Sequence, residues 1–337
     1  MASNAFVVSG EHTDTGMPIL ENDPHLANQI PCQHMLASLK FNDGRVVSGS
    51  MIPGWPSIMI GRSNHLVWGF TASRADTSDM WQETLSEDGT EYLVDGEWRK
   101  LEITETVIKT FMGEDVILPV KRTHRGNLIS FETLKTNSAL LFGGKVPEIP
   151  DNGKFYSFAW QGQFIGEDSL GLSKAIFESK DLHEFFDKLD NQPLGQSYKG
   201  AGQNTLLADD SGNIGYRMLT TMPERKDKTP FIGNRILDGT TSKHDWTGEV
   251  VPMKEMPKLM NPKSGYITSA NGRQTSDHAL TDYGSTINTH ARQRKIDRVL
   301  KKKTESGEKF TYQDALDLMH DVSIPDGGFH RQVRLLK

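Results

Sequence analysis

The chain has 337 residues, of which 36% are hydrophobic and 24% charged, and its mean hydropathy is -0.52. This composition is typical of a soluble globular protein that is long enough to bury a sizeable core. Its 44 acidic and 38 basic residues give a net charge of -6, which argues against nucleic acid or a membrane surface as a partner. No apolar stretch approaches the roughly 18 residues of a membrane span, and the first residues lack signal-peptide regions, which leaves the compartment open.

The first 170 residues predict strands joined by turns. Asp-Gly lies between β-rich runs at 41–49 and at 92–101, and this is the strongest local signal for a hairpin. The short apolar runs SIMIG, HLVWGF and EDVILPV have the length and the β-branched content of strands. Residues 206–219 predict a further strand–turn–strand unit.

Helices are expected later in the chain. Apolar residues recur at helical spacing over 172–190, as two short helices, and over the basic stretch 291–303. Thr311 and Asp314 form a capping-box pattern before a helix whose apolar stripe is Ala315, Leu318, Met319 and Val322. Strands followed by helices, without regular alternation, indicate an α+β fold with a largely antiparallel sheet.

Common catalytic and metal-binding motifs are absent from the sequence. It contains no G-x-S-x-G, H-E-x-x-H, P-loop or G-x-G-x-x-G pattern, and its eleven histidines show no metal spacing. The single cysteine, Cys32, excludes an internal disulfide and a cysteine-based zinc site. No base-like residue lies near it, so we expect Cys32 to be a small buried apolar residue.

Several local features have ordinary interpretations when each is taken alone. The stretch ENDPHL at 21–26 favours a loop fixed by its proline. Asp76 and Asp79 are either solvated or, with main-chain carbonyls, oxygen ligands for calcium. Asn271 is a turn residue by default, and Arg292 belongs to a basic, solvated helix face.

The order of eight segments changes this interpretation. Together they resemble the β chain of the penicillin acylase family of N-terminal nucleophile hydrolases. The segments are Ser3-Asn4, T-x-T-G-M-P-I-L-E-N-D-P-H-L at 13–26, IPGWPSIMIGRSNHLVWGFTAS at 52–73, D-x-x-D at 76–79, QNTLLADDSGNIGY at 203–216, MPER at 222–225, NPKSGYITSANG at 261–272 and HARQRKIDRVL at 290–300. The resemblance implies a four-layer αββα sandwich and one domain over residues 1–337, truncated at both ends.

The resemblance gives Ser3 a chemical role that a serine near a chain end otherwise lacks. In this family the first residue of the β chain is the nucleophile, released by autocatalytic cleavage of a zymogen. Its α-amine then acts as the base, since such an amine titrates near pH 7.7–8.0. Met1 and Ala2 precede Ser3, so its nitrogen is an amide. We expect either cleavage between Ala2 and Ser3 or an artificial start.

The same resemblance assigns site residues by position. The implied catalytic set is the nucleophile Ser3, the amine-orienting His25, the oxyanion donors Ala72 (backbone N–H) and Asn271 (side chain), and the supporting Arg292. Pro24, Leu26 and Ile60 fall on positions that line the acyl pocket. A structural calcium site is implied at Asp76, Ser78 (through its carbonyl), Asp79 and Asp282, and no organic cofactor is implied.

The implied function is an amidohydrolase that cleaves N-acylated amines through an acyl-enzyme, as in antibiotic metabolism. An acyl-homoserine-lactone or other long-acyl amide acylase of the same family is an alternative. Two others are a non-catalytic family member with a binding role and a calcium-binding extracellular β protein. The expected partners are a small-molecule amide and an α chain from the same precursor, in a heterodimer. The resemblance suggests a periplasmic, secreted or lysosome-like location.

Overall fold

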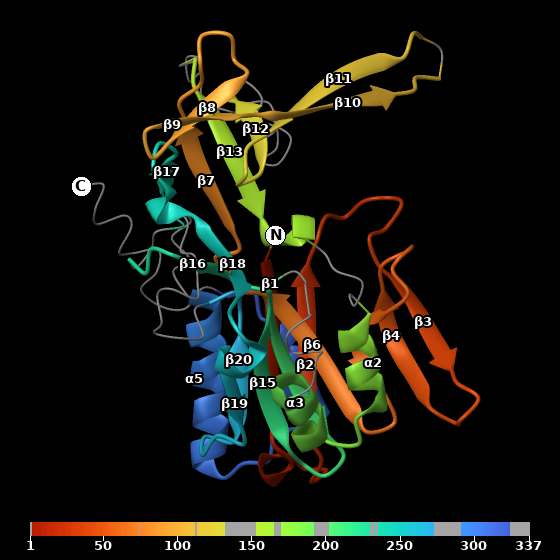
Figure 1. The fold of residues 1–337 in the computed structure, drawn as a ribbon. Helices are drawn as coiled ribbons and strands as arrows, with labels where there is room; N and C mark the ends of the chain where they lie inside the picture. The colour runs from red at the N-terminus through yellow and green to blue at the C-terminus, as the bar shows by residue number, and fades with distance from the viewer. Residues whose placement is uncertain are drawn as a thin grey trace. The chain divides into compact units, whose positions relative to one another are not determined.

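The structure is a computed structural model that describes residues 2–73, 75–111, 113–131, 153–164, 170–191, 202–229, 233, 235–272 and 291–323 (Figure 1). The chain divides into two compact units. The first comprises Met1–Ala75, Ile165–Thr221 and Val251–Lys337, and the second comprises Asp76–Phe164 and Met222–Val250. The single domain expected from the sequence stays a prediction, and each unit is described by itself.

A three-stranded antiparallel sheet of the first unit carries the start of the chain. Its order is β2 (Ile19–His25), β1 (Ala2–Val8) and β20 (Tyr266–Ser269). Phe6 and Val8 share a buried cluster with the neighbouring helices. Because side chains alternate along a strand, Ser3 lies on the other face of this sheet.

A seven-stranded antiparallel sheet forms the second β-layer of this unit. Its order is β19 (Lys258–Met260), β15 (Ile214–Leu219), β14 (Gln203–Asp209), β6 (Leu66–Ala72), β5 (Ile58–Arg62), β4 (Val46–Met51) and β3 (Met35–Lys40). β1 packs across β6 and β14, so the two sheets lie face to face.

Helices cover the outer face of each sheet. The helices α5 (Ala291–Ser306) and α6 (Tyr312–His320) bury Ile296, Leu300 and Leu318 against β1. On the seven-stranded sheet, Phe177 of α2 (Gly171–Glu178) meets Trp68, and Phe186 of α3 (Leu182–Asn191) lies over Gly215. The layer order is therefore helix, sheet, sheet, helix, and Figure 1 shows α2 and α3 over the strands.

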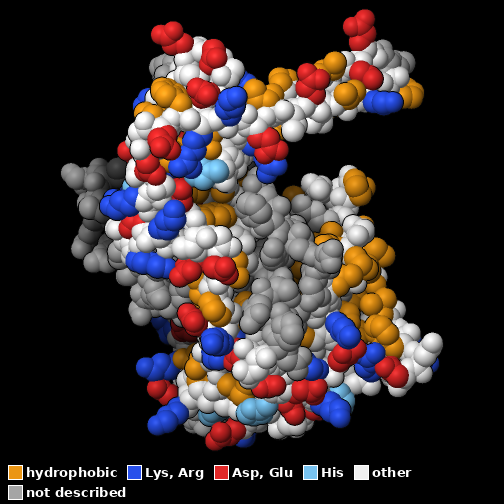
Figure 2. All heavy atoms as spheres, viewed as in Figure 1, with side chains coloured by type: hydrophobic (Ala, Val, Ile, Leu, Met, Phe, Trp, Pro, Cys, Tyr) orange, Lys and Arg blue, Asp and Glu red, His pale blue; other side chains and the backbone are white. Residues whose placement is uncertain are grey.

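The second unit is built on a six-stranded sheet. Its order is β10 (Glu102–Ile108), β11 (Val116–Arg122), β12 (Asn127–Ser130), β13 (Phe155–Trp160), β7 (Ser78–Glu83) and β17 (Ile236–Asp238), with the β7–β17 pair parallel. A hairpin pairs β8 (Glu91–Val94) with β9 (Glu97–Lys100), and a separate two-stranded sheet pairs β16 (Pro223–Arg225) with β18 (Trp246–Val250). Figure 2 shows hydrophobic side chains along the β10–β11 hairpin. Val107 of β10 and Ile117 of β11 are exposed.

Short 3-10 helices complete the described elements: η1 (Gly10–His12), η2 (Gln161–Phe164), η4 (Ser242–His244) and η5 (Met253–Glu255). Among the described residues, no helix combines the length and the apolar character needed to cross a membrane.

Most elements follow the sequence prediction. The α+β class with largely antiparallel strands is confirmed. The Asp-Gly turns close the β3–β4 and β8–β9 hairpins, and Asp95 and Gly96 have the positive φ values that such a turn requires. Both sequence-predicted helices of 172–190 form, and the capping box of Thr311 and Asp314 opens α6.

Three expectations were wrong. Residues 21–25 are not a loop but the end of β2, an edge strand, where Pro24 costs no ladder hydrogen bond to a second neighbour. Cys32 is exposed, not buried, because it lies in the segment that leaves β2. Val322 does not join the stripe of α6, since the helix ends at His320 and the Val322 side chain is exposed.

Candidate active site

Ser3 lies near the start of β1, at the centre of the three-stranded sheet, and is buried. Its backbone nitrogen donates a 2.6 Å hydrogen bond to Oδ1 of Asn271, and its hydroxyl donates one of 2.6 Å to the carbonyl oxygen of Ala2. Both atoms that the predicted chemistry uses, the nitrogen and the hydroxyl oxygen, are thus held in defined positions.

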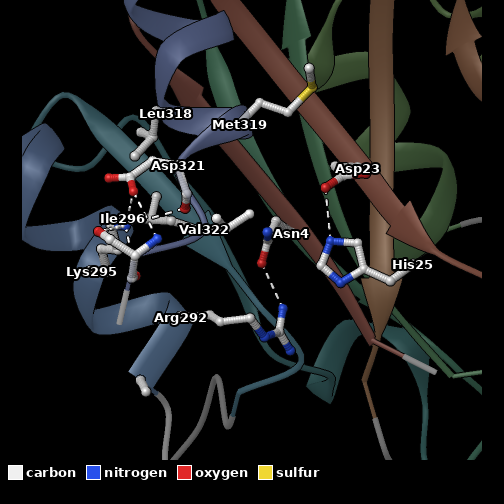
Figure 3. A pocket seen from close by; sticks show the side chains of 12 residues that line it. Asn4, Asp23, His25, Arg292, Lys295, Ile296, Leu318, Met319, Asp321 and Val322 are labelled. Atoms are coloured by element: carbon white, nitrogen blue, oxygen red, sulfur yellow. Dashed lines mark hydrogen bonds and ion pairs between the residues drawn. The ribbon is translucent and has the colours of Figure 1, made fainter. Parts of the chain in front are cut away.

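Arg292, in the first turn of α5, hydrogen-bonds both to β1 and to the residues that follow β20. Its guanidinium donates to the carbonyl oxygen of Ser3 at 2.5 Å and to Oδ1 of Asn4 at 2.6 Å. It also donates to the carbonyl oxygen of Ala270 and to Oδ1 of Asn271, both at 3.0 Å. Figure 3 shows the Arg292–Asn4 contact. A planar guanidinium can bridge several acceptors in this way, whereas an ammonium group is a point charge.

Asn271 follows β20 with a φ of 62°, in the left-handed region that asparagine tolerates better than most residues. Its Oδ1 accepts from Ser3 and Arg292, so its Nδ2 is on the opposite side of the amide, 3.1 Å from the carbonyl oxygen of Ala72. The orientation of the amide is therefore set by two donors, and Nδ2 is directed toward β6.

The N–H of Ala72 has a direction that follows from the ladder of β6. The N–H of Ser73 donates to Gly202 on the β14 side, at 3.0 Å. Since successive N–H groups of a strand point to opposite edges, the N–H of Ala72 points away from β14. Asn271 accepts from the Ser3 nitrogen and donates to the Ala72 carbonyl oxygen, so it links Ser3 to the end of β6.

His25 is placed differently from the other predicted catalytic residues. It pairs with Ala2 in the β1–β2 register, one position beyond the Ser3–Pro24 pair, so its side chain lies on the helix side of the sheet. Its Nε2 is 2.8 Å from Oδ2 of Asp23, and within the described ranges no hydrogen bond joins it to Ser3. Its predicted part in orienting the amine stays a prediction.

A pocket of about 320 Å³ opens on this helix side (Figure 3). Asn4, Asp23 and His25 of the sheet line one part of it, and the rest is lined by polar and apolar residues of α5, α6 and the segment that follows α6. The pocket lies behind the sheet that carries Ser3, on the opposite face from the hydroxyl.

The three residues predicted to line the acyl pocket lie in or next to β2 and β5. Pro24 is directly opposite Ser3 in the register. Leu26 follows β2 and is exposed, and Ile60 lies partly buried in β5, the neighbour of β6. Their assignment to an acyl pocket stays a prediction.

The predicted calcium residues lie in the second unit, and Asp282 lies outside the described residues. Asp76 and Asp79 are buried, and Arg225 donates to Oδ1 of the first at 2.8 Å and to Oδ2 of the second at 2.7 Å. Oδ1 of Asp79 is buried without a hydrogen-bond partner in the described part of the chain. Ser78 is the first residue of β7.

One feature of this arrangement suits calcium. The buried Oδ1 of Asp79 has no hydrogen-bond partner among the described residues, and calcium prefers carboxylate oxygen ligands. Asp79 therefore fits part of a calcium site. No group of three or more His, Cys, Asp or Glu side chains in the ranges that the structure describes is arranged to hold a metal ion, so further ligands are needed from elsewhere.

Comparison with known proteins identifies the family. A family model described as Penicillin amidase matches residues 1–329 of the chain. The chain belongs to the penicillin amidase family. Among its relatives in this family, Penicillin G acylase of Escherichia coli is 27% identical over 331 residues, which cover 96% of the chain and 35% of that protein. Acyl-homoserine lactone acylase QuiP of Pseudomonas aeruginosa is 24% identical over 278 residues, or 81% of the chain and 30% of that protein.

A solved structure has the same fold as this penicillin amidase family member. Thermostable penicillin G acylase from Alcaligenes faecalis aligns with a TM-score of 0.74 at 20% identity, over 94% of the chain and 51% of that chain. The expected sandwich fold of N-terminal nucleophile hydrolases is thereby confirmed. The chain spans about a third of the length of the curated relatives it matches.

Three residues to which the sequence analysis gave no site role take part in these networks. Asn4 accepts from Arg292, Arg225 binds both buried aspartates, and Asn22 bridges the two sheets of the first unit. All three had a signal in the sequence, because each lies in a segment that carries the family resemblance. Arg225 lies 146 residues from Asp79 along the chain, and its pairing depends on the fold.

Proposed function

We propose that this chain carries the nucleophile of an amidase that hydrolyses N-acylated amines through an acyl-enzyme on Ser3. The observation that supports it most is one network in which Arg292 and Ser3 both donate to Oδ1 of Asn271. A further support is the pair of donors from Ala72 and Asn271, because two donors near a nucleophile suit the oxyanion of acyl transfer.

In the proposed reaction, the α-amine of Ser3 takes the hydroxyl proton as the oxygen attacks the amide carbonyl carbon. The negative charge on the carbonyl oxygen of the intermediate is stabilised by the Ala72 N–H and Asn271 Nδ2. The C–N bond then breaks, and the α-ammonium gives its proton to the leaving amine. Water repeats the sequence on the ester, which releases the carboxylic acid and restores Ser3.

The mechanism requires a free amine on Ser3, and here Ala2 acylates that nitrogen. We therefore propose that the Ala2–Ser3 bond is cleaved before the protein is active. The position of the Ser3 hydroxyl supports this step, since Oγ lies 2.6 Å from the carbonyl oxygen of the bond to be cut. Attack of Oγ on that carbonyl carbon forms an ester and frees the nitrogen, and water then hydrolyses the ester.

The test expresses the protein that contains this chain and determines the mass and N-terminal sequence of its products. We expect a chain that begins at Ser3, and a Ser3→Ala variant that is uncut and has no amidase activity. A Ser179→Ala variant, which removes a buried hydroxyl at the end of α2, away from this network, controls for general effects of losing a buried hydroxyl. An uncut protein with full activity would overturn the proposal.

The proposal also concerns the chemical nature of the substrate's acyl group and amine. Relatives are named as a penicillin G acylase and as acyl-homoserine lactone acylases, so we propose an N-acyl amine with an apolar acyl group. Leu26 and Ile60, both aliphatic, support an apolar pocket. A panel of chromogenic anilides with phenylacetyl, butanoyl, octanoyl and dodecanoyl groups distinguishes aryl from long-chain preference by kcat/KM.

We also propose two partners. An α chain from the same precursor is supported by the length of the relatives, of which the chain covers about a third. A calcium ion is supported by the buried Oδ1 of Asp79, which has no hydrogen-bond partner in the described part of the chain. Bound there, calcium would neutralise the buried carboxylates and link Asp79 to other oxygen donors, without a part in the chemistry.

A further inference from the structure

The two donors proposed for the oxyanion come from different sheets of the first unit. Ala72 ends β6 of the seven-stranded sheet, and Asn271 follows β20 of the three-stranded sheet. Their separation therefore depends on how the two sheets lie against each other. Apolar packing between sheets is not directional, whereas catalytic donors must be held within about 0.5 Å. Directional contacts between the two sheets, such as hydrogen bonds, must therefore set the separation of Ala72 and Asn271.

A first contact of this kind is made by Asn22 of β2. Its side-chain amide accepts from the N–H of Phe70 at 2.9 Å and donates to the carbonyl oxygen of Phe70 at 3.0 Å. It also donates to the carbonyl oxygen of Asn4 at 2.8 Å. One amide thus binds the backbone of β6 two residues before Ala72 and the backbone of β1 one residue after Ser3.

Gly69 makes room for this contact. A Cβ atom at Gly69 would lie 2.7 Å from the Cβ of Asn22 and 2.8 Å from its Oδ1. Such distances are shorter than any van der Waals contact, so a side chain there would displace the amide. The close approach of Asn22 to β6 explains the glycine at this position.

A second contact joins β6 to β20. The hydroxyls of Thr71 and Ser269 are 2.7 Å apart, and both residues are fully buried. Thr71 is adjacent to Ala72, and Ser269 is two residues before Asn271. Asn204 extends the contact on the β14 side with a 3.4 Å hydrogen bond to Thr71, and Tyr216 donates to Asn204 at 2.9 Å.

We propose that Asn22 and the Thr71–Ser269 pair are positioning residues that set the distance between the two oxyanion donors and Ser3. They act through the backbone of β1, β6 and β20 and touch no reacting atom. The proposal rests on the proposed amidase function. Its chemical consequence is specific: loss of either contact weakens binding of the tetrahedral intermediate and leaves substrate binding nearly unchanged.

The test compares Asn22→Ala, Gly69→Ala and Thr71→Val with Thr205→Val in the processed, full-length protein. Thr205 is the matched control, because it pairs with Phe70 across β14 and β6 and its buried hydroxyl has no hydrogen-bond partner among the described residues. Activity is expressed per active site, counted from the burst of acylation, so that loss of folded protein does not count as loss of rate.

For the three variants, we expect kcat per site to fall on the order of 10- to 100-fold, the effect of a displacement near 1 Å, with KM changed less than threefold. Affinity for a boronic acid that forms a tetrahedral adduct should fall in parallel. Thr205→Val should match the wild type. Rates per site that are the same in Asn22→Ala, Thr71→Val and Thr205→Val would overturn the inference.

A second measurement does not depend on activity. Amide hydrogen exchange at Phe70 and Ala72 should be faster in Asn22→Ala and Gly69→Ala than in Thr205→Val, because the contact that holds this part of β6 is lost. An inactive wild type would overturn the amidase function itself, while unchanged exchange in both variants would overturn the positioning role.

Discussion

At the scale of single residues, Glu21 is the most unusual side chain of the three-stranded sheet. It lies on β2 opposite Phe6, on the helix side, and both its carboxyl oxygens are buried without a hydrogen-bond partner in the described part of the chain. Burial, and secondarily the charge of Asp23, raise the pKa of Glu21 from 4.5 to about 8. The folded protein therefore holds a proton there that the unfolded chain releases.

The raised pKa predicts how stability depends on pH. Between pH 4.5 and 8 the folded state binds more protons than the unfolded state, so the free energy of unfolding falls as pH rises through this window. Glu21→Gln should match the wild type near pH 4.5 and be more stable by a few kcal/mol, at about 1.4 kcal/mol per pKa unit, near pH 8.5. Urea unfolding at both pH values measures the difference, with the exposed Glu105→Gln as control. Equal stabilities of wild type and Glu21→Gln at pH 8.5 would contradict it.

Arg292 gives a second prediction at this scale. Its guanidinium binds four acceptors on Ser3, Asn4, Ala270 and Asn271, and a lysine cannot reach all of them. We expect Arg292→Lys to lower kcat per active site on the order of 10²-fold, similar to the loss of an oxyanion donor. Arg298→Lys, an exposed change on the same helix, should have no effect. Comparable rates for the two variants would show that the bridging geometry is dispensable.

At the scale of elements, the N-terminus of α6 is the clearest case of local sequence supporting tertiary packing. Thr311 accepts from the N–H of Asp314 at 3.1 Å, and the Asp314 carboxylate accepts from the N–H of Thr311 at 2.8 Å. The helix then places Ala315 and Leu318 in the cluster that covers Phe6 and Val8 of β1. A loss of the cap should therefore affect the layer behind the nucleophile strand.

Removal of the Thr311 cap should lower the stability of the protein and leave its catalytic mechanism unchanged. Thr311→Ala should lower the free energy of unfolding by about 1 kcal/mol, whereas Thr311→Ser, which keeps the capping hydroxyl, should lose much less. Denaturant midpoints of both variants test this. A Thr311→Ala protein as stable as Thr311→Ser would show that the cap contributes nothing in this context.

At the scale of the whole molecule, the proposed calcium ion belongs to the second unit and the nucleophile to the first. We expect the desalted protein to retain about one calcium ion per chain, by elemental analysis. Asp79→Asn should lose the ion, because it replaces the carboxylate ligand with a neutral amide. Asp88→Asn, on an exposed turn of the same unit, should keep it. Retention by both variants, or no calcium in the wild type, would remove the assignment.

The sequence alone determined the features that depend on neighbours along the chain. The α+β class, the Asp-Gly hairpins and the α6 cap follow from local propensity and hydrophobic period, which act over a few residues. The order of the family segments likewise placed Ser3, Asn271 and Arg292 in one site before any coordinates. Hydrogen bonds join these three residues in the structure, and their catalytic roles stay predictions.

Only the tertiary structure decided to which face of its sheet each side chain points and which group, distant along the chain, it contacts. Strand pairing put His25 behind the sheet and Ser3 in front of it, although the two stand in adjacent register positions. It brought Arg225 to Asp79 and Asn22 to Phe70. The physical reason is the same in each case. The face to which a side chain points depends on strand register, and a contact between sheets depends on packing, and no short stretch of sequence specifies either.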